Sequence, residues 1–339
     1  MAHTGPNPPD TTQPDTDPPQ TKQPSLSGKD FLFVERVLTR MKLKQLRLLV
    51  AVERHKSILY AARELHLSQP AATKQIKDLE QDFGVLLFER TNRGVLPTIY
   101  GAALARHGRL ILAQIANAAQ ELDDLSEGSD GRVVVGTLLA ASSLLLPRTI
   151  GTVLRERPSL SVKIVEGTND VLMPRLRSGE LDMVVGRLPT HRHRDDIAQE
   201  RLLEEPIVVV ARAGHPLTQA PAVGLADLMR YRWILPPRET TLRRQIEEMF
   251  QGAGATQTLS PVESVAFLAN RSLMMATEML GIVPKHVVAD DISAGALQVI
   301  DWPVPIPEGP VGVSVAREGT LTPAAAYFLE MLRSTAAEL

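Results

Sequence analysis

A stretch at residues 57–76, SILYAARELHLSQPAATKQI, predicts two short helices joined by a tight turn. Ser68 is a suitable cap for the second helix, and Pro70 falls in its first turn, where a missing N–H costs little. HLS supplies the turn. Apolar or small side chains recur at helical spacing in the first helix: Ile58, Ala61, Ala62 and Leu65.

The second of these helices is predicted to have a buried side and a polar side. Spacings of four, three and four residues join the apolar set Ala72, Ile76, Leu79 and Phe83. The other side carries Gln69, Thr73 and Lys77, with Lys74 beside them. Such side chains reach base edges or phosphates in a major groove, and a helix N-terminus favours phosphate. A solvated amphipathic helix would show the same pattern, so the neighbouring segments must decide.

Those neighbours favour a DNA-binding unit. A preceding helix with Leu43, Leu46, Leu49 and Val50 would complete a three-helix core. LLFERTNRGVLPT then predicts strand, turn and strand, with Asn92 and Arg93 at the tip. Such a wing would carry Arg90 and Arg93 toward the DNA backbone or minor groove. We therefore expect Ser68, Gln69, Pro70, Thr73, Lys74, Lys77, Arg90, Asn92 and Arg93 to form the DNA-binding surface.

These segments carry a family resemblance. AARELHLSQPA and LEQDFGVLLFER resemble the N-terminal domain of the LysR-type transcriptional regulators, and the resemblance extends from about Met41 to the end of the chain. SILYAA departs from the pattern of many members, which have an aromatic residue or Thr after the Ser. VVGRL and RAGHPL look most like the branch that governs genes for sugar uptake or protocatechuate-type aromatic breakdown.

Composition narrows the classes of protein further. The absence of cysteine excludes a disulfide scaffold, a thiolate zinc site and a catalytic thiol, and suits a reducing cytoplasm. No apolar run approaches the roughly 20 residues of a membrane span, so we expect no membrane partner. The net charge is −2, but residues 42–110 carry twelve Lys and Arg against six Asp and Glu, whereas residues 111–130 carry five acids and no Lys or Arg. Positive charge is thus concentrated near the predicted DNA-binding unit.

The domain organisation follows from changes along the chain. Residues 1–40, rich in Pro, Thr, Gln and Asp over most of their length, are expected to be a disordered tail. A winged helix-turn-helix at 41–97 and a linker helix at 98–127 come next, and EGSDG separates them from residues 131–339. There, short β-branched runs alternate with helical stretches, which predicts an α/β domain with parallel strands.

The linker helix has an apolar seam. Spacings alternate four and three from Leu104 through Gly108, Ile111, Ile115, Ala118, Leu122 and Leu125. A helix lying on its own domain would also produce this pattern. The family resemblance implies dimerisation through the helix and commonly a tetramer built from two dimers, with RNA polymerase as a further partner.

The resemblance also implies that residues 131–339 fold like a periplasmic binding protein, with two lobes joined by two crossing strands and an effector between them. We expect lobe one at 131–206 and 312–339 and lobe two at 207–311. Candidate effector ligands at strand ends or helix starts are Ser142, Ser143, Thr168 and Asn169, each of which could instead only cap a helix. The family pattern makes Arg187 a ligand-side residue, and its guanidinium suits a carboxylate. Across the cleft we expect Arg238, Thr240 and Thr241.

Two functions from different classes compete at this stage. The first is a DNA-binding transcriptional regulator in the cytoplasm that responds to a small organic acid or sugar, without a cofactor. The second is a small-molecule-binding protein or enzyme whose helices only dimerise it. No GxSxG, P-loop or GxGxxG motif occurs, and HRHR at 191–194 lacks carboxylates or other His at ligand spacing. The first function is therefore favoured.

Overall fold

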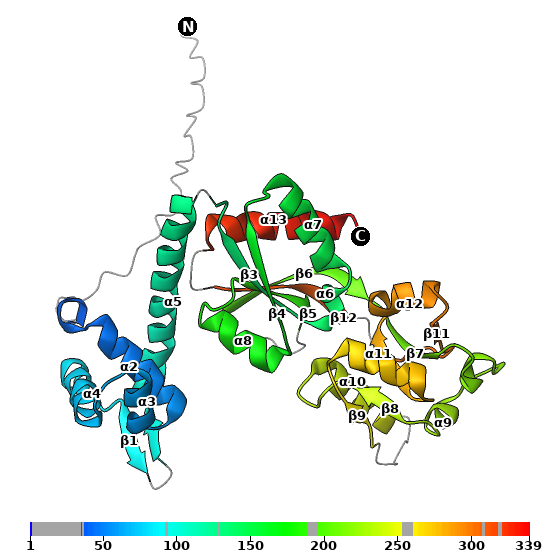
Figure 1. Ribbon diagram of the computed structural model, residues 1–339, viewed down its shortest axis with the longest axis horizontal. Coiled ribbons are helices and arrows are strands. Elements are labelled where there is room, and N and C mark those ends of the chain that lie inside the picture. The colour runs from blue at the N-terminus through cyan, green and yellow to red at the C-terminus, as the bar shows by residue number, and fades with distance from the viewer. Residues whose placement is uncertain are drawn as a thin grey trace.

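The computed structural model describes residues 1, 35, 37–91, 94–127, 129–188, 196–252, 260–306, 309–317 and 321–339, and for residues 124, 125 and 127 only the backbone. The winged unit, the long helix α5 and two α/β lobes follow one another along the chain and in space (Figure 1). This arrangement confirms the predicted fold class. The tail expectation is wrong at its end, because residues 35 and 37–40 are helical and Arg40 lies 3.6 Å from Asp82.

The winged unit has three helices and a two-stranded hairpin: α2 (Leu43–His55), α3 (Ile58–Glu64), α4 (Gln69–Phe83), β1 (Phe88–Thr91) and β2 (Gly94–Pro97). Ser57 caps α3 and Ser68 caps α4 by accepting backbone N–H groups, as side chains of this kind do at helix starts. The core contains the expected Ala72, Ile76 and Leu79. The expected role of Leu43 is wrong, since its side chain is exposed, while Val50 and Phe83 are only partly buried.

Two contacts fix the wing to the helices. The Glu80 carboxylate of α4 accepts hydrogen bonds from the backbone N–H groups of Leu87 and Phe88, at 2.9 and 3.3 Å. Val95 N donates to Lys56 O at 2.9 Å. Gly94 has φ +118°, and a Cβ there would lie 2.7 Å from Lys56 O, so only glycine fits this position without strain. The wing is therefore held against both ends of the helix-turn-helix.

Helix α5 (Ile99–Glu127) begins where the wing ends. Thr98 accepts the Gly101 N–H at 3.1 Å, and its own hydroxyl donates to Leu86 O at 2.7 Å. A Cβ at Gly101 would stand 1.9 Å from Leu87 O, so the first turn of α5 lies directly against the backbone before the wing. Gly108 similarly admits the side chains of Leu46 and Val50 from α2. The first half of α5 is thus part of the winged unit.

Lobe one is built on the strand order β4-β3-β5-β12-β6. Strands β3 (Arg132–Thr137), β4 (Ser161–Glu166) and β5 (Met183–Arg187) are parallel, and β12 (Gly309–Ala316) runs antiparallel to β5 and to β6 (Ile197–Glu205). Helices α6 (Leu139–Ser142), α7 (Leu145–Glu156), α8 (Asn169–Arg177) and α13 (Pro323–Ala337) accompany this sheet. The β-branched runs became strands because both faces of the central strands are covered.

Lobe two repeats the plan with the order β11-β7-β10-β8-β9. Its strands are β7 (Ile207–Arg212), β8 (Trp233–Leu235), β9 (Val262–Glu263), β10 (Leu280–Pro284) and β11 (Leu297–Val299). Its helical elements are η1 (Pro216–Thr218), α9 (Leu225–Leu228), α10 (Thr241–Gly252), α11 (Phe267–Ala276), η2 (Lys285–Val288) and α12 (Ala289–Ser293).

Two chain crossings join the lobes. The first lies at Pro206, between β6 and β7, at the position expected from the sequence. The second precedes Gly309, because all of β12 pairs within the lobe-one sheet and Gly309 stands opposite Glu205. Lobe one therefore resumes at Gly309 rather than at residue 312. The expected boundary at residue 312 is wrong because Gly309, Pro310 and Val311 already pair with β6.

The contact between α5 and the wing yields a stability prediction. Gly101→Ala places a methyl group against Leu87 O and should destabilise the winged unit by about 1–3 kcal/mol, because backbone must move. Urea unfolding followed by circular dichroism measures the effect.

Gly151→Ala is the matched control. Gly151 lies inside α7 with nothing within 4 Å of an added Cβ, so the same substitution should stabilise by about 0.5–1 kcal/mol. Equal effects of the two substitutions would contradict the proposed close contact at Gly101.

Candidate DNA-binding surface and effector cavity

Helix α4 presents a polar and basic side to solvent. Gln69, Pro70, Lys74 and Lys77 are exposed, and Thr73 is half-buried beside them. The Ser68 hydroxyl accepts the Ala71 N–H at 3.4 Å, so this serine caps the helix whatever else it contacts. Arg90 is exposed on β1, whereas Asn92 and Arg93 lie outside the described residues. The α4 side chains and Arg90 form one accessible set suited to phosphates and base edges.

The apolar seam of α5 divides into two parts. Leu104 packs on the core of the winged unit, so its expected place in a dimer contact is wrong. Farther along, Ile111, Ile115 and Leu122 are 40%, 43% and 69% exposed, and Ala118 is exposed with them. The side chain of Leu125 lies outside the described residues. The exposed part is an apolar stripe, defined here as Ile111, Ile115, Ala118 and Leu122.

The opposite side of α5 faces lobe one. A cavity of about 430 Å³ is lined by Ala113, Ala116 and Asn117 of α5 and by residues of lobe one that include Arg132 and Lys163. At its edge a Cβ added to Gly179 would lie 2.7 Å from the Cβ of Ala113. The apolar stripe is therefore on the side of α5 that points away from its own effector domain.

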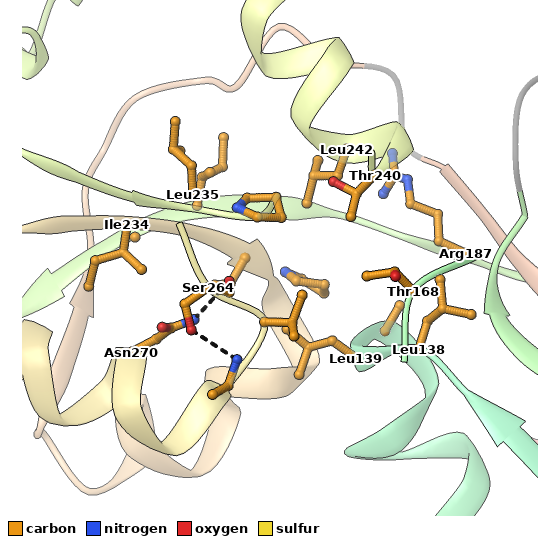
Figure 2. A pocket seen from close by; sticks show the side chains of 18 of the residues that line it. Leu138, Leu139, Thr168, Arg187, Ile234, Leu235, Thr240, Leu242, Ser264 and Asn270 are labelled. Atoms are coloured by element: carbon orange, nitrogen blue, oxygen red, sulfur yellow. Dashed lines mark hydrogen bonds between the residues drawn. The ribbon is translucent and has the colours of Figure 1, made fainter. Parts of the chain in front are cut away.

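A cavity of about 340 Å³ lies between the two lobes. Figure 2 shows Arg187 and Thr168 of lobe one at one side, with Thr240 and Leu242 above them, and Ile234, Ser264 and Asn270 of lobe two at the opposite side. The ends of β4 and β5 and the start of α8 supply the lobe-one residues. This is the edge at which open α/β sheets bind ligands.

Four of the predicted effector ligands besides Arg187 line this cavity: Thr168, Asn169, Thr240 and Thr241. Thr168 stands at the start of α8 but makes no side-chain cap hydrogen bond, so its hydroxyl is not committed to that helix. Asn169 Nδ2 donates to Arg187 O at 3.5 Å, and its Oδ1 is buried with no partner. Thr240 has a helix-capping role, because its Oγ1 accepts the Arg243 N–H at 3.3 Å.

Three predicted ligands lie elsewhere. Ser142 does not line the cavity, and its hydroxyl donates to Leu139 O within the short helix α6. Ser143 is exposed and also absent from the lining. Arg238 is 69% exposed and lies 3.8 Å from the carboxylates of both Glu247 and Glu263, so it belongs to a surface ion-pair cluster. The expectation that ligands bind at strand ends identified the correct edge of the sheet, but it did not predict the direction in which these three side chains point.

Arg187 is the buried cation of the cavity. It is 7% exposed, and its Nη2 donates to Gln245 Oε1 of lobe two at 3.2 Å. Burial lowers the Arg187 pKa and the charge of Glu205 raises it. Burial raises the pKa of Glu205 to about 8, against the opposing effect of Arg187. The Arg187 guanidinium and the Glu205 carboxyl thus lie in a desolvated region that disfavours the charged form of each group, while each partly stabilises the charge of the other.

Other lining residues were missed in the sequence. Ser264 and Asn270 of lobe two join the cavity, with Asn270 Nδ2 donating to Ser264 O at 3.4 Å. Leu138, Ile234 and Met274 belong to a larger apolar set that also lines it. No motif marks these residues, because each is an ordinary core or loop residue until β8, β10 and α11 bring them together.

Within the described segments no cluster of His, Asp and Glu could hold a metal ion, and HRHR lies outside those segments. No helix in the described part of the chain is both long and apolar enough to cross a bilayer.

A winged helix-turn-helix joined by a long helix to a two-lobed domain with an internal cavity defines a DNA-binding regulator that carries an effector-binding domain. Residues 43–102 match the family described as bacterial regulatory helix-turn-helix protein, lysR family, and residues 126–337 match the LysR substrate binding domain. The chain belongs to the LysR family of transcriptional regulators. Since this family is not enzymatic, the alternative of an enzyme is excluded.

Individual relatives support the same assignment. The regulator GbpR of Azospirillum brasilense is 33% identical over 296 residues, which is 87% of this chain and 86% of GbpR. PcaQ of Agrobacterium fabrum is 32% identical over 301 residues, covering 88% of this chain and 96% of PcaQ.

Solved structures show the same fold. Full-length CbnR bound to its target DNA has a TM-score of 0.58 at 24% identity, covering 87% of this chain and all of the CbnR chain. A full-length OxyR variant from Pseudomonas aeruginosa has a TM-score of 0.57 at 25% identity, covering 88% of this chain and 95% of that one.

The exposed side of α4 predicts that some of its side chains contact phosphates and others contact bases. Lys77→Ala should weaken binding to all DNA sequences alike and reduce the slope of log K against log salt by about one unit per lost phosphate contact. Thr73 and Gln69 should instead set sequence preference, because short polar groups near the helix start lie nearest the bases. Fluorescence anisotropy with operator and scrambled duplexes measures both.

Lys163→Ala is the control for Lys77→Ala. Lys163 is an exposed lysine on β4 of the effector domain, and its loss should leave the salt slope unchanged. If Lys77→Ala changed which duplex is preferred, the assignment of Lys77 to phosphate would be wrong.

The apolar stripe predicts a subunit contact. Ile115→Asp should split the dimer and abolish operator binding, because an unpaired charge in an apolar contact costs several kcal/mol in order of magnitude. Ile115→Leu keeps the apolar surface and should remain dimeric. Sedimentation equilibrium gives the mass of each; an unchanged mass for Ile115→Asp would remove the stripe from the interface.

Proposed function

We propose that the protein binds an operator as a dimer through α4 and the wing and responds to a small anionic or hydroxylated effector held between its two lobes. The observation that supports the effector site best is the cavity itself. It is lined from both lobes, by the buried guanidinium of Arg187, by a Thr168 hydroxyl that makes no cap hydrogen bond and by the side chain of Asn169. Pockets of this kind are the usual places for small ligands.

The charge at Arg187 supports an acid as the ligand. A buried guanidinium favours an anion, since a charge-assisted hydrogen bond in a desolvated site is stronger than one in water. Glu166 also contributes to the lining, but its side chain is exposed and more strongly screened by water.

The same residues connect ligand binding to the arrangement of the lobes. Arg187 lies on β5 of lobe one and bonds to Gln245 on α10 of lobe two. A ligand carboxylate that draws on Arg187 therefore competes with a contact between the lobes. An effector changes an equilibrium only if it binds two arrangements with different affinity, and competition of this kind supplies such a difference.

Assembly completes the proposed function. The exposed stripe of α5 supports dimerisation, and a symmetric dimer suits a two-fold operator. A stripe as short as Ile111 to Leu122 gives a marginal interface alone, so we infer additional contacts in a tetramer of two dimers. The regulator acts on the chromosome in the cytoplasm and contacts RNA polymerase. Regulation of genes for sugar uptake or aromatic breakdown remains the expectation from VVGRL and RAGHPL.

The effector site is tested by Arg187→Ala in the full-length protein. A thermal-shift screen of sugars, sugar acids and aromatic acids identifies ligands, and titration calorimetry then measures their affinity. Loss of the charge-assisted bond should weaken an acid by roughly 1.5–3 kcal/mol. Thr168→Val should have a smaller effect, because a neutral hydroxyl contributes less than a charged group.

Arg238→Ala is the matched control, since it removes an arginine from lobe two that does not line the cavity. Its ligand affinity should equal that of the wild type. An acid that binds Arg187→Ala as tightly as the wild type would move the effector site elsewhere.

A further inference from the structure

Helix α5 runs beside lobe one and is attached to it at two places (Figure 1). The first is Ala113, because a Cβ placed on Gly179 would lie 2.7 Å from the Cβ of Ala113. The second is the linker after the helix, where Ser129 Oγ donates to Ser159 O at 3.1 Å. Between these places the two surfaces enclose the cavity of about 430 Å³, so no continuous apolar packing sets the position of the helix.

Two attachment points restrict the direction of a helix far more than one. The part of α5 from Ala113 to its end at Glu127 is about 21 Å long. A helix held only by its linker could swing about that point, whereas a helix held at both ends of such a segment keeps its direction. The close approach depends on the glycine, because any side chain at position 179 would meet Ala113.

The lobe-one side of this contact is a firmly bonded turn. Gly179 has φ +73°, a conformation that favours glycine, and its N–H donates to Leu176 O at 3.1 Å. Three residues later, Asp182 Oδ2 accepts the Val134 N–H at 2.7 Å, and Asp182 N donates to Val134 O at 2.9 Å. The turn that contacts α5 is therefore fixed to β3 as well as to β5.

Strands β3 and β5 connect this turn to the effector cavity. β5 begins directly after Asp182 and ends at Arg187, and β3 leads to Leu138; both Arg187 and Leu138 line the effector cavity. The two strands pair with each other and span roughly 15–20 Å. Strands that are paired on both edges and packed on both faces transmit a displacement with little loss, because a close-packed interior is hard to compress.

We propose that α5 and lobe one move as one body in each subunit, joined at Ala113 and Gly179, and that this joint is kept when the protein binds its operator. The first half of α5 belongs to the winged unit through Gly101 and Gly108, so lobe one is linked rigidly to the DNA-binding surface. Lobe two is then the part whose position changes relative to that surface, because two chain crossings suited to a hinge join it to lobe one. The joint does not depend on which molecule occupies the effector cavity.

The absence of cysteine from the chain allows a direct test by disulfide formation in the full-length protein. Ala113→Cys combined with Gly179→Cys brings two thiols together after a small outward shift to the usual Cβ separation of about 3.8 Å. Mild oxidation should join them within one chain, as measured by the loss of free thiols and by the mass on a denaturing gel without reductant. Ala113→Cys combined with Gly151→Cys is the matched control and should stay reduced, because α7 contributes no residue to the cavity beside α5.

A second pair is needed because Gly179→Cys strains a backbone conformation that favours glycine. Ala113→Cys combined with Glu180→Cys uses the exposed neighbour of Gly179, which lines the same cavity. This pair should also oxidise faster than the control. The joint is wrong if neither pair oxidises faster than the control, or if the disulfide joins two chains instead of one.

Operator binding tests whether the joint is kept on DNA. The oxidised and reduced forms of a cross-linked variant should bind a duplex from the region upstream of the protein's own gene with equal affinity, measured by fluorescence anisotropy. An oxidised form that binds about tenfold more weakly, a difference of about 1.4 kcal/mol, and recovers with reductant would overturn the proposal, because α5 and lobe one would have to separate on DNA. Failure of the wild-type protein to bind would count against the proposed operator and leave the disulfide result unaffected.

Discussion

Arg187 lies beside the two chain segments that connect the lobes, and its position limits which residues those segments can contain. A Cβ on Gly309 would lie 2.1 Å from Arg187 Cζ, so the guanidinium occupies the space that a side chain at the second crossing would need. Gly309 pairs with Glu205, the last residue before the first crossing at Pro206. The cation is therefore held where both connections between the lobes pass, and it reaches lobe two through Gln245. Any change at Arg187 acts directly on the region that a hinge motion would use.

Helix α5 has three different environments along one element. Its first turns are joined to the winged unit through Gly101 and Gly108, one side farther along faces lobe one at Gly179, and the exposed stripe lies on the other side. A periodic pattern of four and three residues describes all of these positions equally well. The seam could therefore be predicted, but not the point at which it passes from the core of its own subunit to a free surface. Leu104 was assigned to the interface for this reason.

Local chemistry made the winged unit predictable. Ser57 and Ser68 cap their helices, Gly84 ends α4 with a positive φ, and the buried set of α4 follows helical spacing. Each of these signals involves residues a few positions apart, so the sequence contains both partners. The cavity, by contrast, is lined by residues more than a hundred positions apart in the sequence, such as Thr168 and Asn270. Their positions at strand ends correctly predicted that Thr168, Asn169 and Arg187 line the cavity. The same reasoning wrongly predicted Ser142 and Ser143, because the short helix α6 determines where these two side chains point.

The sequence by itself determined the class of the protein: a helix-turn-helix with a wing, a long helix and an alternating α/β region, each defined by local spacing and composition. Only the tertiary structure decided the character of the effector cavity. Leu138, Ile234 and Met274 are apolar residues like those of any core, and Asn270 carries no motif. They come to line one cavity because the two lobes leave a space between them. Arg187 and Asn270 are both buried, and burial strengthens the interactions of a charged or polar side chain. Their burial depends on which distant segments come together.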